Sequence, residues 1–442
     1  GNWSIPAVVL IYLFLNFLYQ ENIIDPRNKA YGLDYSNENQ RPAYQRDSIL
    51  KMVTPDAIDA DKKVFTSMLN TWKQKQQKDT PVLFIINTSG GGTRSATFTF
   101  DVLQKLDSVT GGKLMGQTFL INGASGGLLG AAYFRDLYWQ KQKDQKVDIQ
   151  DNSYAKNISR DLLNPLFSSF VSRDFIGPVR TFDYGGYTYS RDRGFSFEEK
   201  LNDNTRGLLD KKLADYKAAE EHADIPVMFF NSMITRDGRE MIISTHPARF
   251  LMQPYQDTSA VFPTDPDAID FTSFFARQNP LNLRVLSALR MNATFPYVLP
   301  NVWLPSDPVI DVIDAGLRDN FGQGTSSRFI NHFSDWMRHN TEKVVLIQIR
   351  DRQIGDWDRP YEANSIIGFI TKPFLLLQSD YAETHHSEFF VNGNGKLLAN
   401  TTAAAFHYEI KHANHFSFTD APFFVAGPGR LLLAQVIGGG RG

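Results

Sequence analysis

The feature that most constrains the fold is a pattern that occurs twice: an apolar strand, a glycine-containing turn and an amphipathic helix. The first copy has an apolar run at 81–87, the turn Thr88-Ser-Gly-Gly-Gly-Thr-Arg94 and helical spacing over 96–106. The second copy has a strand at 118–122, the turn Gly123-Ala-Ser-Gly-Gly127 and a helix over 128–138. Consecutive units of this kind place their strands parallel. The sequence therefore predicts an α/β fold with a mostly parallel central sheet flanked by helices.

Other segments extend this prediction over most of the chain. Apolar runs at 226–231, 239–244 and 343–349 are predicted to be further strands of the same sheet. An amphipathic helix is expected at 59–77, ahead of the first strand, and a loop at 184–189. Ser196, followed by Glu199, has the pattern of a capping box that opens another helix.

Composition limits the classes of function. With 442 residues, 42% of them hydrophobic, the chain can bury a substantial core. The formal net charge is −2 and no long run of either sign occurs, which argues against nucleic acid as a partner. The chain has no cysteine, so disulfides, thiolate nucleophiles and cysteine-ligated zinc are excluded.

The most apolar window lies at 5–19, where Asn16 is the one strongly polar residue. A spanning helix needs roughly 20 apolar residues, and the basic region that opens a signal peptide is missing. We interpret residues 1–22 as a membrane helix whose beginning has been lost, with Trp3 and Tyr19 as interfacial anchors. The alternative is a buried core helix. The polar composition of 21–46 predicts a linker between the membrane and the folded domain.

The two glycine turns carry the candidate chemistry. Residues 123–127 match G-x-S-x-G, in which small neighbours permit a sharp strand-to-helix turn that presents a serine hydroxyl. Ser125 is therefore the candidate nucleophile. Glycine backbone can approach a substrate without a β-carbon, so the first turn is a candidate oxyanion hole. The glycines expected in the nucleophile elbow are Gly123, Gly126 and Gly127. Those expected in the oxyanion hole are Gly90, Gly91 and Gly92.

Phosphate binding is the competing interpretation of the first turn. The turn lacks the Gly-Lys-Ser/Thr sequence of a Walker loop. Ser95 stands where a dinucleotide fingerprint would need its last glycine. Nucleotide binding is therefore disfavoured, and Arg94 is left to orient the loop or a substrate.

The order of these motifs resembles the patatin-like phospholipases. That family has a G-G-G-x-R turn, then G-x-S-x-G, and finally an Asp-Gly-Gly or Asp-Gly-Ala turn preceded by a stretch rich in small residues and proline. Here the stretch lies at 287–300 and the turn begins at Asp314. The segment 231–238 is similar to the central strand of the family and the turn after it. The resemblance covers 80–377.

The resemblance implies a three-layer α/β fold and a Ser–Asp dyad that works without histidine. Asp314 would accept the proton of Ser125, which would attack an ester carbonyl of a membrane lipid. A carboxylate of ordinary pKa is a weak base, so burial would have to raise the pKa of Asp314. No cofactor or metal is implied. Two residues depart from the family pattern, because Ser95 and Ala315 stand where glycine is usual.

The apolar window, the polar segment after it and the extent of the resemblance together set the expected domain organisation and location. Residues 1–22 form the membrane helix, 23–80 the linker and leading helix, 81–380 the patatin-like catalytic domain, and 381–442 a C-terminal extension of uncertain role. The protein is expected at a membrane, by a single span or as part of a larger membrane segment. Residues 5–19 would contact the bilayer, and the catalytic domain would lie on the cytoplasmic side.

Two alternatives stay open. Ser125, Asp314 and His415 follow the Ser, Asp, His chain order of an α/β-hydrolase triad. A catalytically impaired scaffold with a protein partner in a membrane assembly is also compatible with Ala315. Histidines at 385, 386, 412 and 415 lack an acidic partner at ligand spacing, so a metal site is not predicted.

Overall fold

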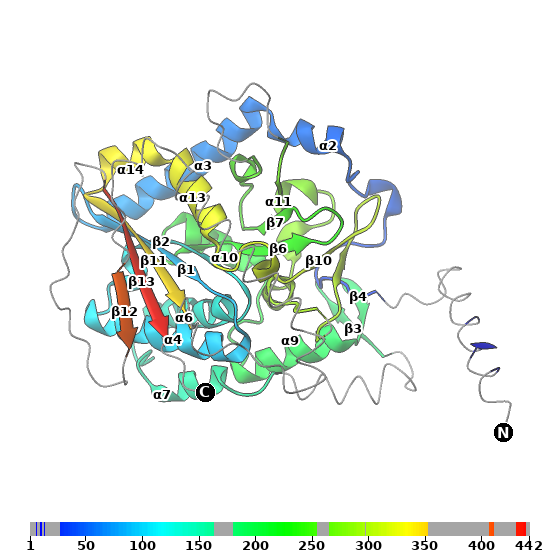
Figure 1. The fold of residues 1–442 in the computed structure, drawn as a ribbon, viewed down its shortest axis with the longest axis horizontal. Helices are drawn as coiled ribbons and strands as arrows, with labels where there is room; N and C mark the ends of the chain where they lie inside the picture. Colours follow the sequence, from blue (N-terminus) through cyan, green and yellow to red (C-terminus); the bar gives the residue numbers. More distant parts are fainter. Residues whose placement is uncertain are drawn as a thin grey trace, which may run out of the picture.

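The computed structural model of the chain describes residues 27–162, 180–253, 265–296, 298–351, 406–410 and 430–438, together with Pro6, Val9, Leu10 and Leu13. A six-stranded sheet of order β12-β13-β11-β1-β2-β5 lies between two layers of helices (Figure 1). Each neighbouring pair runs parallel, so the predicted parallel central sheet is confirmed. Its strands are β1 (Val82–Thr88), β2 (Thr118–Gly123), β5 (Val227–Met228), β11 (Lys343–Arg350), β12 (Phe406–Ile410) and β13 (Arg430–Gly438). The C-terminal extension thus supplies two strands to this sheet.

Helices cover both faces of the parallel sheet. One face carries α4 (Gly92–Val109) and α6 (Ser125–Lys143), and the other carries α3 (Pro55–Lys75), α13 (Gln323–His332) and α14 (Ser334–Asn340). Strand side chains alternate between the faces. Ile86 packs with α4 and α6, whereas Leu83 and Ile85 pack with α3 and α13. The sheet and the helices on its two faces therefore form three layers.

A second sheet of five strands has the order β8-β7-β6-β10-β9. Its strands are β6 (Phe230–Ile234), β7 (Glu240–Ile243), β8 (Ala268–Asp270), β9 (Val302–Leu304) and β10 (Ile310–Ile313). Only β7 and β8 pair in parallel, and the other pairs are antiparallel. Placing 230–231 and 239–244 in the central sheet was therefore wrong. A buried apolar run indicates a strand, but its periodicity does not reveal the pairing partner.

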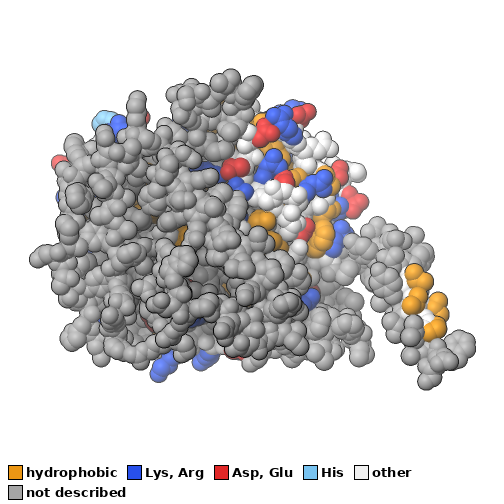
Figure 2. Space-filling view, in the orientation of Figure 1, with side chains coloured by type: hydrophobic (Ala, Val, Ile, Leu, Met, Phe, Trp, Pro, Cys, Tyr) orange, Lys and Arg blue, Asp and Glu red, His pale blue; other side chains and the backbone are white. Residues whose placement is uncertain are grey.

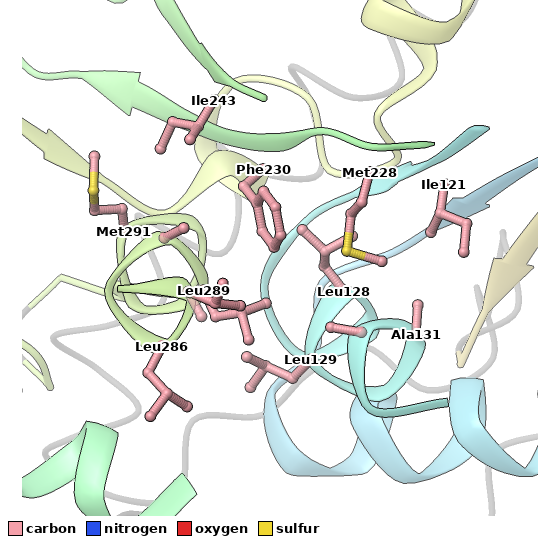
Figure 3. Close-up of a cluster of buried hydrophobic side chains, with 14 of the residues drawn as sticks. Ile121, Leu128, Leu129, Ala131, Met228, Phe230, Ile243, Leu286, Leu289 and Met291 are labelled. Atoms are coloured by element: carbon pink, nitrogen blue, oxygen red, sulfur yellow. The ribbon is translucent and has the colours of Figure 1, made fainter. Parts of the chain in front are cut away.

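A shared apolar core joins the two sheets. Figure 3 shows Phe230 of β6, Met228 of β5, Leu128 of α6 and Leu289 of α12 (Val285–Asn292) in one cluster. All four side chains are completely buried. The region that carries α12 is therefore packed against the helix that follows the G-x-S-x-G turn.

Two local assignments between the sheets were also wrong. The expected loop at 184–189 is a hairpin of β3 (Thr181–Tyr184) and β4 (Tyr187–Ser190), because Gly185 and Gly186 have the positive φ of a tight turn. The next helix, α9 (Arg193–Asn204), begins before Ser196, because Asp192 is its N-cap and accepts from the Phe195 N–H. Further helices among the described residues are α2 (Arg46–Leu50), α5 (Leu114–Gln117), α7 (Asn152–Ile158), α10 (Leu213–Glu221), α11 (Phe271–Phe274) and the 3-10 helices Glu38–Gln40, Lys51–Val53, Arg249–Leu251, Pro280–Asn282 and Ala315–Leu317.

The predicted linker at 21–46 is wrong for its described part. Ala30, Tyr31 and Leu33 are completely buried. The Tyr31 N–H donates to Ser287 Oγ at 3.1 Å, on α12. The polar composition of the segment concealed this short apolar anchor, so the folded domain begins earlier than expected.

Most of the window at 5–19 lies outside the described residues. Pro6, Val9, Leu10 and Leu13 are helical, and the last three are about half exposed or more. Figure 2 shows hydrophobic side chains on this N-terminal segment and intermixed charges on the visible described surface. Among the residues that the structure describes, none of the helices has the length and apolar character needed to cross a membrane.

Candidate active site

Ser125 lies at the carboxyl end of the parallel sheet, where α6 begins directly after β2. Its φ is +50°, in the left-handed region that residues with a β-carbon rarely adopt. The Ala124 N–H donates to the Thr88 carbonyl at 3.0 Å, which holds the turn against β1. Strain of this kind persists where the surrounding structure fixes it, and the sharp turn agrees with the geometry expected of G-x-S-x-G.

The glycines after Ser125 allow the two glycine turns to touch. A β-carbon at Gly126 would lie 1.9 Å from the Gly92 carbonyl oxygen, and one at Gly127 would lie 2.4 Å from the Ser89 carbonyl oxygen. Real β-carbons do not approach backbone so closely. The start of α6 therefore packs on the first turn only because these positions lack side chains.

The three glycines of the first turn differ in what their N–H groups do. Gly90 donates to the carbonyl oxygen of Asn320 at 3.2 Å and to its Oδ1 at 3.0 Å, so its N–H is occupied. Gly91, with φ +149°, is the N-cap of α4, and this helix start has no side-chain cap. In the described part of the chain, the N–H groups of Gly91 and Gly92 have no acceptor. These two remain candidates for binding an oxyanion.

Asp314 follows β10, in the second sheet, and caps the 3-10 helix Ala315–Leu317. Its Oδ1 accepts from the Gly316 N–H at 2.7 Å, and its side chain is buried. Burial raises the pKa of Asp314 to about 6, while hydrogen bonding to the Ser125 hydroxyl and the Gly316 N–H lowers it in part. The structure thus brings Ser125 and Asp314 together from different sheets.

The contact between Ser125 and Asp314 is looser than a standard hydrogen bond. Oδ2 of Asp314 is buried and has no partner at full hydrogen-bond geometry among the described residues. The Ser125 hydroxyl is nevertheless near enough to affect the pKa of the carboxyl group. Catalytic hydrogen bonds are often long or poorly aligned until substrate binds, so this geometry is compatible with a nucleophile and its base.

The two departures from the family pattern are accommodated locally. Ala315 lies in a 3-10 helix and has the ordinary negative φ of that conformation, so its β-carbon causes no backbone strain. Ser95 is buried, and its Oγ donates to the Ser89 carbonyl at 2.6 Å. The serine therefore closes the first turn by a hydrogen bond that glycine could not make.

Arg94 is paired with a residue that sequence analysis did not identify. Its Nε donates to Oδ2 of Asp351 at 2.8 Å, and the Asp351 side chain is only 4% exposed against 54% for Arg94. A β-carbon at Gly91 would lie 2.7 Å from the same Oδ2. The pair joins the first turn to the end of β11, which indicates that Arg94 orients the turn.

Amide side chains lie around the ends of the strands, and that of Asn122 is completely buried. Asn122, the last but one residue of β2, donates from Nδ2 to the Gly322 carbonyl at 2.7 Å and accepts from Asn231 at 2.9 Å. Asn320 holds Gly90, as described above. Sequence analysis missed these residues. The available signal was a polar residue closing an apolar strand, as Asn122 does.

The described histidines do not contribute to a triad. Side chains are described for His222, His246, His332 and His339, and no contact joins any of them to Ser125 or Asp314. His415, the candidate third member of the triad, lies outside the described residues, as do the histidines at 385, 386 and 412. The triad therefore stays an untested prediction.

No family model and no curated protein matches the chain. Among solved structures, human GIVD cytosolic phospholipase A2 is 12% identical, with a TM-score of 0.34, and the match covers 73% of this chain and 51% of that one. The same human protein in complex with methyl gamma-linolenyl fluorophosphonate is 14% identical, with a TM-score of 0.32 and coverages of 65% and 45%. VipD from Legionella pneumophila is 10% identical, with a TM-score of 0.28 and coverages of 74% and 57%. The chain thus spans about half the length of these structures. At this level of likeness they assign no family, and function is inferred below from the site.

Proposed function

We propose that the protein is a lipid acyl hydrolase of the phospholipase type, with Ser125 as nucleophile and Asp314 as general base. One observation carries the proposal: a serine held at φ +50° in a strand-to-helix turn lies beside a buried carboxyl group whose pKa is raised to about 6. A raised pKa makes the carboxylate a stronger base, yet one that is still largely ionised at neutral pH.

The reaction would follow from these positions. Asp314 takes the proton of the Ser125 hydroxyl while Oγ bonds to the ester carbonyl carbon. Negative charge on the carbonyl oxygen is stabilised by the free N–H groups of Gly91 and Gly92 and by the uncapped starts of α4 and α6. Asp314 returns the proton to the leaving alcohol as the ester bond breaks. It then takes a proton from the water that attacks the acyl-enzyme carbonyl, and returns this proton to Ser125 Oγ as the acyl–Oγ bond breaks and the fatty acid leaves.

The membrane lipid substrate is proposed from the N-terminal window. Each buried Leu, Ile, Val or Phe is worth roughly 1.5–3 kcal/mol, so a nearly continuous apolar stretch at 5–19 favours a lipid environment. The exposed helical residues Val9, Leu10 and Leu13 support this interpretation. A tether would raise the effective concentration of the enzyme beside an insoluble substrate. Membrane attachment with the catalytic domain on the cytoplasmic side remains part of this proposal.

The scaffold alternative has less support. It depended on the apolar window at 5–19 and on Ala315 disturbing the turn after Asp314, but Ala315 adopts an ordinary conformation. A protein partner was proposed only with that alternative. The two functions differ in whether Ser125 is activated, and that property can be measured directly.

Labelling by a fluorophosphonate tests the proposal. This probe bonds covalently to an activated serine and needs no knowledge of the natural lipid. We expect wild type to be labelled at Ser125, and Ser125→Ala and Asp314→Asn to remain unlabelled while circular dichroism shows both folded. Absence of labelling of folded wild type would contradict the hydrolase and favour the scaffold.

A further inference from the structure

Asn292 joins the two sheets beside the Ser125 turn. It is the last residue of α12 and is completely buried. Its Nδ2 donates to the Gly123 carbonyl at the end of β2, at 3.0 Å, and to the Asn231 carbonyl of β6, at 2.7 Å. One amide group therefore holds the carboxyl end of a parallel strand against a strand of the second sheet.

The same short segment also holds Asp314. The Asp314 N–H donates to the Thr294 carbonyl at 2.9 Å, two residues after Asn292. The Thr294 hydroxyl in turn donates to the Arg290 carbonyl at 2.6 Å, which closes the turn after α12. Residues 292–294 are thus bonded on one side to Gly123, close to Ser125, and on the other to Asp314 itself.

The helix that carries this segment is firmly anchored. Arg290 Nε donates to Glu198 Oε1 at 2.8 Å, and both side chains are completely buried. Leu289 and Met291 belong to the apolar core that joins the sheets (Figure 3). Close packing of this kind allows α12 little freedom to move. The hydrogen bonds of Asn292 and Thr294 therefore extend from a fixed support.

We infer that Asn292 is a positioning residue, which sets the separation between the Ser125 hydroxyl and the Asp314 carboxylate. Both of its partners are carbonyl acceptors, so the site needs a side chain with two N–H donors. An apolar replacement would leave two buried carbonyl groups unpaired, and the end of β2 could move away from the second sheet. The inference rests on the proposed function, because it assigns a role in the Ser–Asp reaction.

The test compares Asn292→Leu and Asn292→Ser with Asn204→Leu. Asn204 is a matched control, because it is also completely buried and its Nδ2 donates to a carbonyl, that of Arg160 at 3.1 Å. The measurements are kcat and KM for a soluble p-nitrophenyl ester, their pH dependence and the melting temperature. We expect Asn292→Leu to lower kcat by about 100-fold, since a misplacement of about 1 Å has effects of this size, with KM little changed. Asn292→Ser keeps one hydrogen-bond donor, so its kcat should fall less than that of Asn292→Leu.

The pH profile distinguishes positioning from general destabilisation. Hydrogen bonding to Ser125 lowers the pKa of Asp314, so a wider separation should move the acidic limb of the profile to higher pH. Asn204→Leu should lower the melting temperature without changing kcat or that limb. Wild-type kcat in folded Asn292→Leu, or an equal loss of kcat in Asn204→Leu, would overturn the inference. If Asn292→Leu does not fold, Asn292→Ser is judged by the same criteria.

Crystal structures separate this inference from the proposed function. Wild type that neither hydrolyses the ester nor reacts with a fluorophosphonate would overturn the function. In that case the distance between Ser125 Oγ and the Asp314 carboxylate decides the inference. A longer distance in Asn292→Ser than in wild type supports positioning, and an unchanged distance overturns it.

Discussion

Gly126 and Gly92 lie in direct backbone contact, so that a β-carbon at Gly126 would come within 1.9 Å of the Gly92 carbonyl oxygen. This contact joins the start of α6, where Ser125 lies, to the candidate oxyanion turn. The close approach is possible because Gly126 has no side chain. The position of the nucleophile relative to the oxyanion donors therefore depends on Gly126 having a hydrogen atom where alanine has a methyl group.

Gly126→Ala should abolish fluorophosphonate labelling, because the added methyl group must displace the Gly92 backbone. Gly116→Ala is the matched control, since its β-carbon would meet only the end of the Tyr138 side chain, at 3.3 Å. We expect the control to be labelled at the wild-type rate. Labelling of Gly126→Ala at that rate would show that the two turns do not need this contact.

Ser125→Gly should be more stable than Ser125→Ala, although both remove the hydroxyl group. Only glycine relieves the left-handed conformation at φ +50°. A residue with a β-carbon in the left-handed conformation lowers the free energy of unfolding by roughly 1–2 kcal/mol. Part of this is offset by the greater backbone entropy of unfolded glycine, so the free energies of unfolding of the two variants should differ by about 1 kcal/mol. Urea denaturation of the two variants measures it. Equal stabilities would argue against a strained turn.

The rate of ester hydrolysis should depend on the pKa of Asp314. Burial raises this pKa to about 6, and the ionised carboxylate is the base, so kcat/KM should fall about tenfold per pH unit below that value and level off above pH 7. Asp270→Asn is the control, because Asp270 is also a buried N-cap whose pKa is raised to about 6. Its replacement should leave the profile unchanged. If the acidic limb of the profile moved in Asp270→Asn, the group that titrates would not be Asp314.

Asp314→Asn should be inactive, and its stability relative to wild type should increase as the pH rises from about 4 to 7. The raised folded-state pKa contributes stability below about pH 4, and this stability is lost as pH rises through about 6. Asparagine does not titrate. The variant should therefore gain stability relative to wild type between pH 4 and 7, by up to roughly 3 kcal/mol for a shift of about two pKa units. Thermal melts at both pH values measure the gain, and a constant difference would contradict the raised pKa.

Arg94→Met should reduce activity on all esters, because it removes the partner of the buried Asp351 carboxylate beside Gly91. If Arg94 instead bound only a lipid phosphate, its replacement would raise KM for a phospholipid and leave the hydrolysis of a phosphate-free ester unchanged. Comparing kcat/KM for the two substrates distinguishes these roles. Selective loss with the phospholipid would show that Arg94 binds substrate instead of orienting the turn.

Removal of residues 1–22 should leave a folded hydrolase, because the domain beginning near residue 28 has its own buried anchors in Ala30 and Tyr31. The truncated protein should cleave dispersed short-chain esters at the full-length rate and lose activity on phospholipid vesicles. Circular dichroism and the two assays measure this. Loss of folding would mean that the apolar window belongs to the protein core.

Local sequence was enough to predict the parts of the site that are close in the chain. The strand, turn and helix around Gly90 and around Ser125 follow from apolar runs, glycines and helical periodicity, all of which act over a few residues. The observed β1, α4, β2 and α6 confirm these elements, and each helix extends slightly beyond its predicted bounds. The motif resemblance likewise selected Asp314, but only as a residue type in a known order.

Other parts depended on contacts between distant segments. Sequence patterns did not reveal the second sheet, the hairpin of β3 and β4, the burial of Tyr31 or the pairing of Arg94 with Asp351. Each is fixed by which surfaces meet, and hydrophobic periodicity carries no information about the partner. The amides Asn122, Asn292 and Asn320 were missed for the same reason, since an asparagine looks alike in sequence whether it faces water or bonds to the backbone inside the protein.

The sequence by itself determined that Ser125 follows a strand, opens a helix and has neighbours small enough for a sharp turn. Only the tertiary structure decided that Asp314, from the other sheet, is close enough to the Ser125 hydroxyl for its pKa to be affected and is buried enough for that pKa to rise to about 6. Burial is a property of everything packed around a group, and the pKa shift arises from the water that this packing removes. The turn is therefore local and readable in sequence, whereas the basicity of its partner is a property of the assembled core.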